Sequence, residues 1–190
     1  MIRFAVVGDI GSGKSFISNL FNCPVFNADL EVVDVYKKNK SCFLKIKKLI
    51  PNHFSSFPIK KEELIRSILA DKNNLKKISS IVHPIIRKKL NFFLKKNKNK
   101  KFIVLDIPLY FENKLNKKND IIIYIDAKKK QILKKLKKRK NFNLSLINQF
   151  KSLQYPLKYK KKKSDFVIKN DYKIRTAKNN IKKILKKVDK

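Results

Sequence analysis

The chain has 190 residues and a mass of 22.4 kDa, which fits one domain or one domain with a small insertion. It carries 49 Lys and Arg against 14 Asp and Glu, a formal net charge of +35. Hydrophobic residues make up 43% of the chain, enough for a sizeable core, which excludes a wholly disordered protein. No apolar run approaches the length of a membrane span, and a strand-like run follows Met1 directly, so we expect no membrane helix and no leader.

The basic charge is not spread evenly along the chain. Residues 1–36 hold two basic and four acidic groups, and residues 37–190 hold the other 47 basic and 10 acidic groups. Most of the basic groups are lysine, which, like the abundant Asn, Ile and Phe, is encoded by A/T-rich codons. The charge is therefore weak evidence for a nucleic-acid partner. We expect the lysine runs Lys95–Lys101 and Lys160–Lys163 to be solvated.

The two cysteines, Cys23 and Cys42, have neither the spacing of metal ligands nor that of a disulfide framework. Two free thiols are typical of a reducing compartment, so we expect a cytoplasmic protein.

Apolar periodicity predicts strands that alternate with helices. Ile2–Val7 is apolar apart from one residue and is typical of a strand buried on both faces. From about Leu30 to Lys96 the spacing is helical, and one helix is predicted to begin at Pro84, because the first position of a helix tolerates a missing N–H. The other predicted strands are Pro24–Phe26, Phe102–Leu105, Asp120–Ile125 and Phe166–Ile168, and the other helices are Ser15–Phe21, Lys128–Lys138 and Ile174–Val188.

This order of elements predicts the α/β class, with a three-layer, doubly wound parallel sheet of about five strands. We expect a single domain whose core comprises residues 1–37, 99–138 and 164–190. The helical stretch from about 38 to 98 interrupts the sheet and is predicted to form a lobe of its own.

The glycines of the chain gather in one short segment. There are only three, where average usage of about 7% would give roughly 13. They are Gly8, Gly11 and Gly13. Residues Gly8–Ser15 match G-x-x-x-x-G-K-[ST], directly after a predicted strand and before a predicted helix, which is the context that the motif requires.

Such a segment predicts a phosphate-binding loop of the P-loop NTP hydrolase and nucleotide-kinase type. Glycine lets the backbone approach phosphate oxygens, so that successive N–H groups form an anion-binding nest. Lys14 would bridge the β- and γ-phosphates of ATP, and the Ser15 hydroxyl would ligate Mg²⁺. The alternative is a glycine-rich turn without a ligand.

Two acidic residues follow predicted strands, and ligands of such sheets bind at the carboxyl ends of the strands. Asp106 could hold Mg²⁺, directly or through water, or cap the next turn. Asp29 could accept the proton of an attacking hydroxyl or orient that hydroxyl, or it could be the N-cap of the following helix.

Taken together, these motifs resemble the dephospho-CoA kinase family, over the length of the chain. The segments that match are Ile10–Ser15, Asn27–Asp29, Val82–Pro84, Asp106–Glu112, then Gln154, Pro156 and Lys160, and Asp165–Asn170. The family phosphorylates the ribose 3′-hydroxyl of dephospho-CoA with ATP. The chain departs from the family's pattern where Asn27 replaces an Asp, Phe16 replaces a Thr, and Arg139-Lys140 replaces an Arg-Asp pair.

The resemblance implies a role for each site residue. Catalytic roles fall to Lys14, Asp29 and Arg139. Nucleotide binding falls to Gly8, Gly11, Ser12, Gly13, Lys14, Ser15 and Phe16. Substrate binding falls to Asp29, His83, Pro108, Leu109 and Glu112, and metal binding to Ser15 and Asp106. The lobe at about 38–98 would bind substrate, and residues from about 139 to 163 would form a lid.

Several side chains keep a second interpretation. His83 could cap the helix predicted at Pro84, and Glu112 could pair with lysines at the surface. Tyr155 and Tyr159 could stack on adenine or pack within the lid.

The function that this resemblance implies is ATP-dependent phosphorylation of dephospho-CoA to coenzyme A. ATP and Mg²⁺ would be required, with no membrane and no specific nucleic acid as partner, in a monomer or a weak homo-oligomer. One alternative is another phosphate-loop kinase that acts on a nucleotide or metabolite. Others are a basic nucleic-acid-binding ATPase and a family member that has lost its activity.

Overall fold

The chain folds into two compact units in a computed structural model that describes residues 1–139 and 142–189. One unit comprises residues 1–27 and 97–190, and the other comprises residues 28–96. The second unit starts at Ala28, whereas the helical lobe was predicted to start at about residue 38. The difference is the helix α2 (Ala28–Lys38), which packs against later helices of the second unit.

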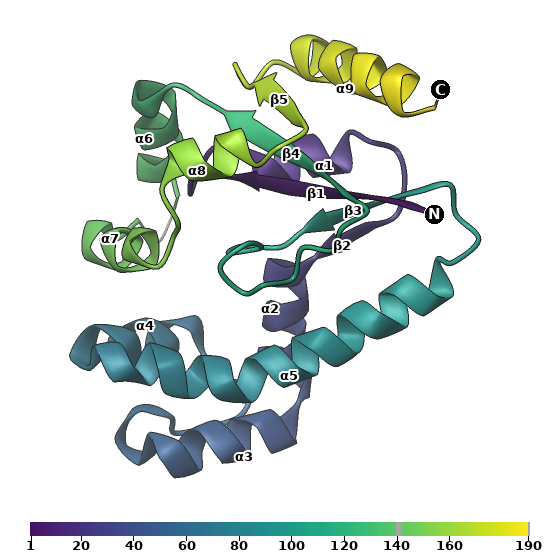
Figure 1. Cartoon of the computed structure of the whole chain (residues 1–190). Coiled ribbons are helices and arrows are strands. Elements are labelled where there is room, and N and C mark those ends of the chain that lie inside the picture. Colours follow the sequence, from purple (N-terminus) through teal and green to yellow (C-terminus); the bar gives the residue numbers. More distant parts are fainter. Residues whose placement is uncertain (140–141, 190) are drawn as a thin grey trace. The chain divides into compact units, whose positions relative to one another are not determined.

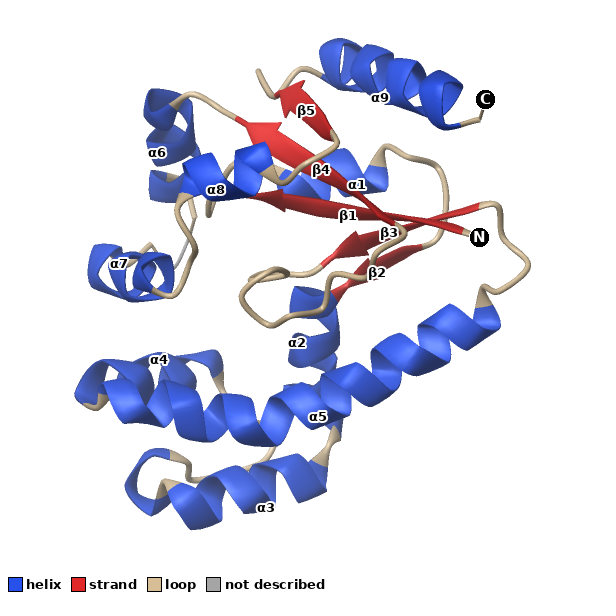
Figure 2. Ribbon diagram, in the orientation of Figure 1, coloured by secondary structure: helices blue, strands red, loops and turns tan. Residues whose placement is uncertain are grey.

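The first unit is built on one parallel sheet, which confirms the predicted fold class. Its strands are β1 (Ile2–Gly8), β2 (Val25–Asn27), β3 (Phe102–Asp106), β4 (Asp120–Asp126) and β5 (Phe166–Lys169). Among the described residues these five strands pair in the order β2-β3-β1-β4-β5, and every pair is parallel (Figures 1 and 2). The apolar strands β1, β3 and β4 take the centre, as expected for strands that are buried on both faces.

The first unit also contains five helices among its described residues, and some of them bury the apolar side chains of the sheet. They are α1 (Lys14–Asn19), α6 (Lys129–Lys137), α7 (Leu144–Ser152), α8 (Leu157–Lys162) and α9 (Ile174–Val188). Ile17 of α1 and Ile181 of α9 are buried in one cluster with Phe4 of β1 and Ile123 of β4. The apolar positions of α9 recur at helical spacing, and this helix has the bounds that the sequence predicted.

The second unit is helical. Besides α2 it contains α3 (Lys40–Leu49), the short 3₁₀ helix η1 (Pro51–His53), α4 (Lys61–Ala70) and α5 (Lys72–Lys96). The long helix α5 packs against α2, α3 and α4, and Figure 2 shows these elements as helices joined by short loops. The residues that α3, α4 and α5 bury include Ile46, Ile68, Ile78 and Val82. In the described part of the chain, no helix is both long and apolar enough to cross a membrane.

The start of a helix at Pro84 was predicted wrongly, because α5 runs through this proline for 25 residues. A proline inside a helix removes one backbone hydrogen bond and crowds the preceding turn, at a cost of about 3 kcal/mol. Packing against three other helices buries Ile78 and Val82 on the N-terminal side of Pro84 and holds the helix together there. His83 is consequently an interior residue of α5, and its interpretation as a helix cap is wrong as well.

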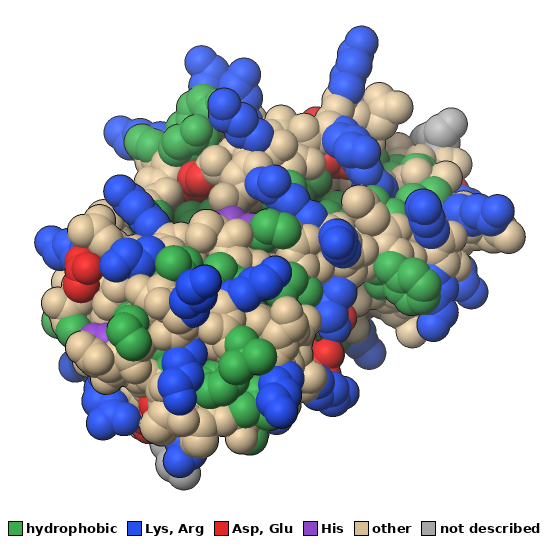
Figure 3. Space-filling model, turned by 90° about the horizontal axis from the view of Figure 1, so that it is seen from below, with side chains coloured by type: hydrophobic (Ala, Val, Ile, Leu, Met, Phe, Trp, Pro, Cys, Tyr) green, Lys and Arg blue, Asp and Glu red, His purple; other side chains and the backbone are tan. Residues whose placement is uncertain are grey.

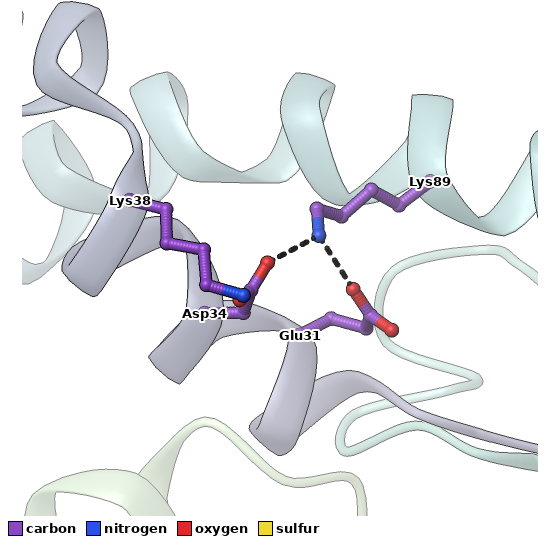
Figure 4. A network of polar contacts seen from close by, with 4 residues as sticks. All are labelled: Glu31, Asp34, Lys38 and Lys89. Atoms are coloured by element: carbon purple, nitrogen blue, oxygen red, sulfur yellow. Dashed lines mark hydrogen bonds and ion pairs between the residues drawn. The ribbon is translucent and has the colours of Figure 1, made fainter.

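An ion-pair cluster joins α2 to α5 within the second unit (Figure 4). The Lys89 ammonium lies 2.8 Å from a carboxylate oxygen of Glu31 and 2.8 Å from one of Asp34. Asp34 also pairs with Lys38, one turn further along α2, at 2.7 Å. Hydrogen bonds from Lys38 and Lys89 lower the pKa of the Asp34 carboxyl to about 2. The cluster therefore adds partly exposed ion pairs to the packing contact between α2 and α5.

Candidate active site

The predicted phosphate loop connects β1 to α1. Gly13 is the N-cap of α1 and has a left-handed φ of 92°, and Gly11 has a φ of 82°. A Cβ at position 13 would lie 2.3 Å from Asn170 Nδ2, and one at position 11 would lie 2.9 Å from Leu136 Cγ. Both glycines are therefore required by their backbone conformation and by the close approach of a neighbouring side chain.

Lys14 is the first residue of α1, and its side chain curls back over the loop. The ammonium donates hydrogen bonds to the carbonyl oxygens of Asp9 at 2.9 Å and Gly8 at 3.3 Å. The Asp9 carboxylate accepts a hydrogen bond from Ile10 N at 2.7 Å and lies 3.7 Å from the Lys151 ammonium of α7. The charge of Lys14 is thus held at the mouth of the loop, where the motif requires a cation.

The remaining residues of the motif differ in exposure. Ser12 is fully buried, and its hydroxyl has no hydrogen-bond partner among the described residues. Ser15 is exposed, so its hydroxyl is accessible. Phe16 packs against the apolar core, so that its side chain points away from the loop and only its backbone is available to a phosphate.

The carboxyl ends of β2 and β3 carry a polar pair. Asn27 lies opposite Asp106 in the parallel register, and its side-chain amide donates to the Asp106 carboxylate at 2.8 Å. Asp106 is 3% exposed. A buried carboxylate at this edge is of the ligand type that Mg²⁺ prefers, and Mg²⁺ usually needs only one or two such groups besides phosphate oxygens. Asp106 and the exposed Ser15 hydroxyl therefore fit the metal that the resemblance implies.

The segment after β3 is anchored to the sheet. Tyr110 donates its hydroxyl proton to the buried Asp120 carboxylate at 2.6 Å, and Arg3 forms an ion pair with the same carboxylate. Burial, together with this hydrogen bond, raises the pKa of the Tyr110 hydroxyl, which therefore remains a donor. Leu109, directly before this tyrosine, has a left-handed φ of 55°. The segment is thus a fixed turn that presents Leu109 toward the phosphate loop.

A small cavity joins this segment to the phosphate loop. Its lining includes Gly8, Lys14, Leu109, Glu112, Gln154 and Lys160. Four predicted site residues, two from the loop and two from the segment after β3, are therefore brought together here. Pro108 does not line this cavity.

Glu112 and Lys160 form a buried ion pair beside the cavity. The Lys160 ammonium nitrogen lies 2.7 Å from a carboxylate oxygen of Glu112. The Glu112 side chain is 8% exposed and the Lys160 side chain 3%. The same oxygen of Glu112 accepts a hydrogen bond from Tyr155 N at 2.7 Å, while its other oxygen has no hydrogen-bond partner within the described residues. Lys160 was predicted to be solvated, and this expectation is wrong. The alternative that placed Glu112 on the surface is also wrong, because its lysine partner is buried with it.

The predicted lid contains helices α7 and α8. Tyr155 and Tyr159 pack edge to face with ring centroids 5.6 Å apart, and Tyr159 packs against Phe111 at 6.3 Å. These contacts agree with the packing interpretation of the two tyrosines. Arg139 is exposed just after α6 and does not line the cavity. Lys140, its neighbour, lies outside the described residues.

Two predicted site residues, Asp29 and His83, belong to the second unit. Asp29 lies in the first turn of α2, where a carboxylate interacts favourably with the helix dipole. The helix begins at Ala28, so Asp29 is not its N-cap. His83 lies inside α5, where burial and the nearby positive charge of Arg87 lower its pKa.

The lowered pKa of His83 predicts a stability that depends on pH. Because the unfolded chain binds this proton more readily than the folded protein, the free energy of unfolding falls as the pH drops below about 6.5, the ordinary value for histidine. In His83→Gln the free energy of unfolding should no longer show this fall at low pH. Urea unfolding at a series of pH values from about 8 to about 5 measures the difference. His53→Gln, which replaces the other histidine, is the control. A slope that persists in His83→Gln and disappears in His53→Gln would contradict the prediction.

Sequence motifs did not reveal every residue that touches the loop. Asn170 and Tyr172, which follow β5, donate hydrogen bonds to loop carbonyls. Three of the residues near the loop belong to segments that match the family, but the match gives them no role: Gln154, Lys160 and Asn170. Tyr172 lies outside every motif. The signal in the sequence was an asparagine shortly after a predicted strand.

The fold and the loop first define a class of protein. A parallel α/β sheet whose first strand leads through a G-x-x-x-x-G-K-[ST] loop into a helix is the architecture of phosphate-loop nucleotide-binding proteins. Within this class, a family model described as dephospho-CoA kinase matches residues 2–176. The chain belongs to the dephospho-CoA kinase family.

Individual relatives agree with this family. The chain is 33% identical over 169 residues to a dephospho-CoA kinase of Wolbachia pipientis wMel, covering 86% of each chain. It is 31% identical over 195 residues to a dephospho-CoA kinase of Bacillus thuringiensis subsp. konkukian, covering 98% of this chain and 96% of the relative. The fold is similar to that of a dephospho-CoA kinase structure from Campylobacter jejuni, with a TM-score of 0.65, 22% identity and coverage of 98% and 96%.

Proposed function

We propose that the protein transfers the γ-phosphoryl group of ATP to the ribose 3′-hydroxyl of dephospho-CoA, giving coenzyme A and ADP. The observation that carries the proposal is the family match over residues 2–176, together with a phosphate loop whose glycines adopt the left-handed conformations that the motif requires. In the reaction, the acceptor oxygen bonds to the γ-phosphorus while the bond from phosphorus to the β–γ bridging oxygen breaks. The hydroxyl proton passes to a carboxylate of the protein.

The phosphate loop binds the donor. Backbone N–H groups of the segment from Gly8 to Phe16 hold the phosphate oxygens of ATP, and the Lys14 ammonium neutralises charge on the β- and γ-phosphates. In the structure Lys14 makes hydrogen bonds to two loop carbonyls, and on nucleotide binding it would exchange them for phosphate oxygens. Such charge-assisted contacts are the stronger kind of hydrogen bond.

Asp106 and Ser15 would hold the magnesium ion. When bound, Mg²⁺ offsets negative charge on the β- and γ-phosphates and orients them for transfer. The hydrogen bond from Asn27 keeps the Asp106 carboxylate oriented at the end of β3.

Asp29 would accept the proton of the acceptor hydroxyl and align that hydroxyl with the phosphorus. His83, Pro108, Leu109 and Glu112 would bind dephospho-CoA. The support for these roles is the match of their segments to the family, and for Leu109 and Glu112 also their place in the cavity that Lys14 lines. Holding donor and acceptor in line supplies much of the rate enhancement in phosphoryl transfer.

Residues from about 139 to 163 would act as a lid that excludes water, with Arg139 on the transferring phosphates. The support is the contact of Tyr155 N and of Lys160 with Glu112, through which this segment is anchored beside the cavity. Excluding water limits the hydrolysis of ATP when no acceptor is bound.

An assay of acceptors tests the proposal. ATP and Mg²⁺ are supplied with dephospho-CoA, with nucleoside monophosphates or with simple sugars, and ADP formation is followed while the product is identified by ³¹P NMR. We expect dephospho-CoA alone to stimulate ADP formation and to gain a phosphate monoester at the 3′ position. Stimulation by a nucleotide or sugar in its place would assign another phosphate-loop kinase, and no stimulation by any acceptor would identify an inactive family member.

A nucleic-acid-dependent ATPase is the alternative that the net charge of +35 suggests. On the face drawn in Figure 3, Lys and Arg side chains are scattered between other side chains and do not gather into one stripe. Such scattering does not favour a nucleic-acid groove, in which basic and aromatic residues line one path. ATPase activity that RNA stimulates and salt abolishes would favour the alternative. We further propose a cytoplasmic location, which the two free cysteines support, and a monomer or weak homo-oligomer.

A further inference from the structure

The loop that follows β5 holds the phosphate loop from outside. The side-chain amide of Asn170 donates to the Ser12 carbonyl at 2.8 Å, and the Tyr172 hydroxyl donates to the Gly11 carbonyl at 2.7 Å. Asn170 is 5% exposed. Two successive peptide groups of the phosphate loop are thus bound by residues more than 150 positions further along the chain.

Asn170 is itself fixed in one orientation. Its backbone N–H donates to the Asp126 carbonyl at 2.7 Å, which places the residue at the end of the β4–β5 ladder. Its side-chain oxygen accepts a hydrogen bond from Tyr172 N at 2.9 Å. Because the oxygen is engaged in this way, the NH₂ group is the part of the amide that faces Ser12.

Tyr172 is also constrained by its surroundings. Its backbone has a left-handed φ of 63°, a conformation uncommon for a residue other than glycine or asparagine. The Lys135 ammonium lies 5.2 Å from the centre of its ring. Burial raises the pKa of its hydroxyl, so that the hydroxyl stays protonated and able to donate to Gly11.

Because each peptide group is planar, a hydrogen bond to its carbonyl also fixes the direction of its N–H. The Ser12 carbonyl and the Gly13 N–H belong to one rigid trans peptide and point in opposite directions. A hydrogen bond that fixes the carbonyl on the outer side of the loop therefore fixes the N–H toward the inner side. The Gly11 carbonyl and the Ser12 N–H likewise belong to one peptide, which is held on both sides because the Ser12 N–H donates to the Asp9 carbonyl at 3.1 Å. The close approach of Asn170 to Gly13, which leaves no room for a Cβ, shows how tightly this peptide is held.

We propose that Asn170 and Tyr172 are positioning residues that fix the peptide groups of the phosphate loop in their nucleotide-binding orientation. The inference rests on the proposed function only in taking ATP as the ligand of the loop. Neither residue needs to touch the reacting atoms. Their loss should weaken the binding of ATP and leave the KM for dephospho-CoA nearly unchanged.

Binding of ATP in the presence of Mg²⁺, measured by titration calorimetry without acceptor, tests this inference. Asn170→Asp replaces the NH₂ donor with an acceptor of the same shape, Asn170→Ala removes the side chain, and Tyr172→Phe removes only the hydroxyl. We expect about tenfold weaker binding for each Asn170 variant and a smaller loss for Tyr172→Phe, as for one lost hydrogen bond. Under turnover, the KM for ATP should rise while that for dephospho-CoA stays within about twofold.

Asn74 offers a matched control. It is 4% exposed, and its side-chain amide donates to the Ser67 carbonyl at 2.9 Å, far from the phosphate loop in sequence and within the second unit. Asn74→Ala and Asn74→Asp should lower the unfolding temperature as the Asn170 variants do, without a change in ATP affinity. Equal ATP affinity in wild type, Asn170→Asp and Tyr172→Phe would overturn the inference. Because binding is measured without acceptor, a failure of the proposed reaction with dephospho-CoA would not produce this result.

Discussion

Lys14→Met should lower kcat/KM by about 10² to 10³, since it removes the charge that neutralises the transferring phosphates. Methionine keeps the length and the apolar stem of the side chain but cannot donate a hydrogen bond. The substitution also removes the two hydrogen bonds from the ammonium to the carbonyls of Gly8 and Asp9. Steady-state kinetics with ATP and dephospho-CoA, together with the unfolding temperature, separates the loss of charge from the loss of loop structure.

Lys89→Met is the control for this change, because it makes the same substitution at a lysine of the second unit that is also engaged by two partners. The Lys89 side chain is 34% exposed, so breaking its ion pairs should destabilise the protein by about 1 kcal/mol or less. We expect kcat to be unchanged. Similar kinetic losses in both variants would show that Lys14 acts only through stability.

Asp29→Asn should lower kcat by about 10² to 10⁴, the range over which a general base contributes. Asparagine keeps the shape of the side chain but cannot accept the hydroxyl proton. The KM for ATP should change little, because the donor is bound by the phosphate loop. Full activity in Asp29→Asn would remove Asp29 from the mechanism, and an equally inactive wild type would identify a family member without catalytic function.

Asp34→Asn, on the same helix, is the matched control for Asp29→Asn. Asp34 pairs with Lys38 and Lys89 and has no proposed part in the reaction. The pKa of the Asp34 carboxyl is lowered to about 2, so the ionised carboxylate stabilises the folded protein at pH values above the ordinary pKa of about 3.9. This stabilisation is lost as the pH falls from about 3.9 to about 2. At neutral pH we expect Asp34→Asn to lower the unfolding temperature slightly and to leave kcat unchanged.

The sheet and the phosphate loop were predictable because their signals are local. A continuous apolar run predicts a buried parallel strand, and the glycine spacing that follows it is typical of a phosphate-binding loop. The helix across Pro84 was not predictable, because what sustains it is packing against α2, α3 and α4, and these contacts exist only in the tertiary structure. Propensity and proline rules describe an isolated helix and give no account of such packing.

The contacts of the buried polar side chains around the loop could not be predicted from the sequence either. A run of four lysines gives no indication that Lys160, unlike its neighbours, is buried against Glu112. That pairing depends on the return of α8 to the first strand, which is a property of the tertiary structure. The contact between Asn170 and Ser12 likewise joins the loops that follow β5 and β1, which only the sheet brings together.

The hydrogen bond between Asn27 and Asp106 bears on how the protein behaves before it meets an ion. If position 27 carried a carboxylate, two like charges would face each other at the ends of neighbouring strands, and one of them would have to take up a proton or a cation. The amide of Asn27 gives Asp106 a neutral donor in place of a repelling charge. This edge of the sheet therefore carries one carboxylate and one neutral donor, and the two side chains pair there without a second negative charge.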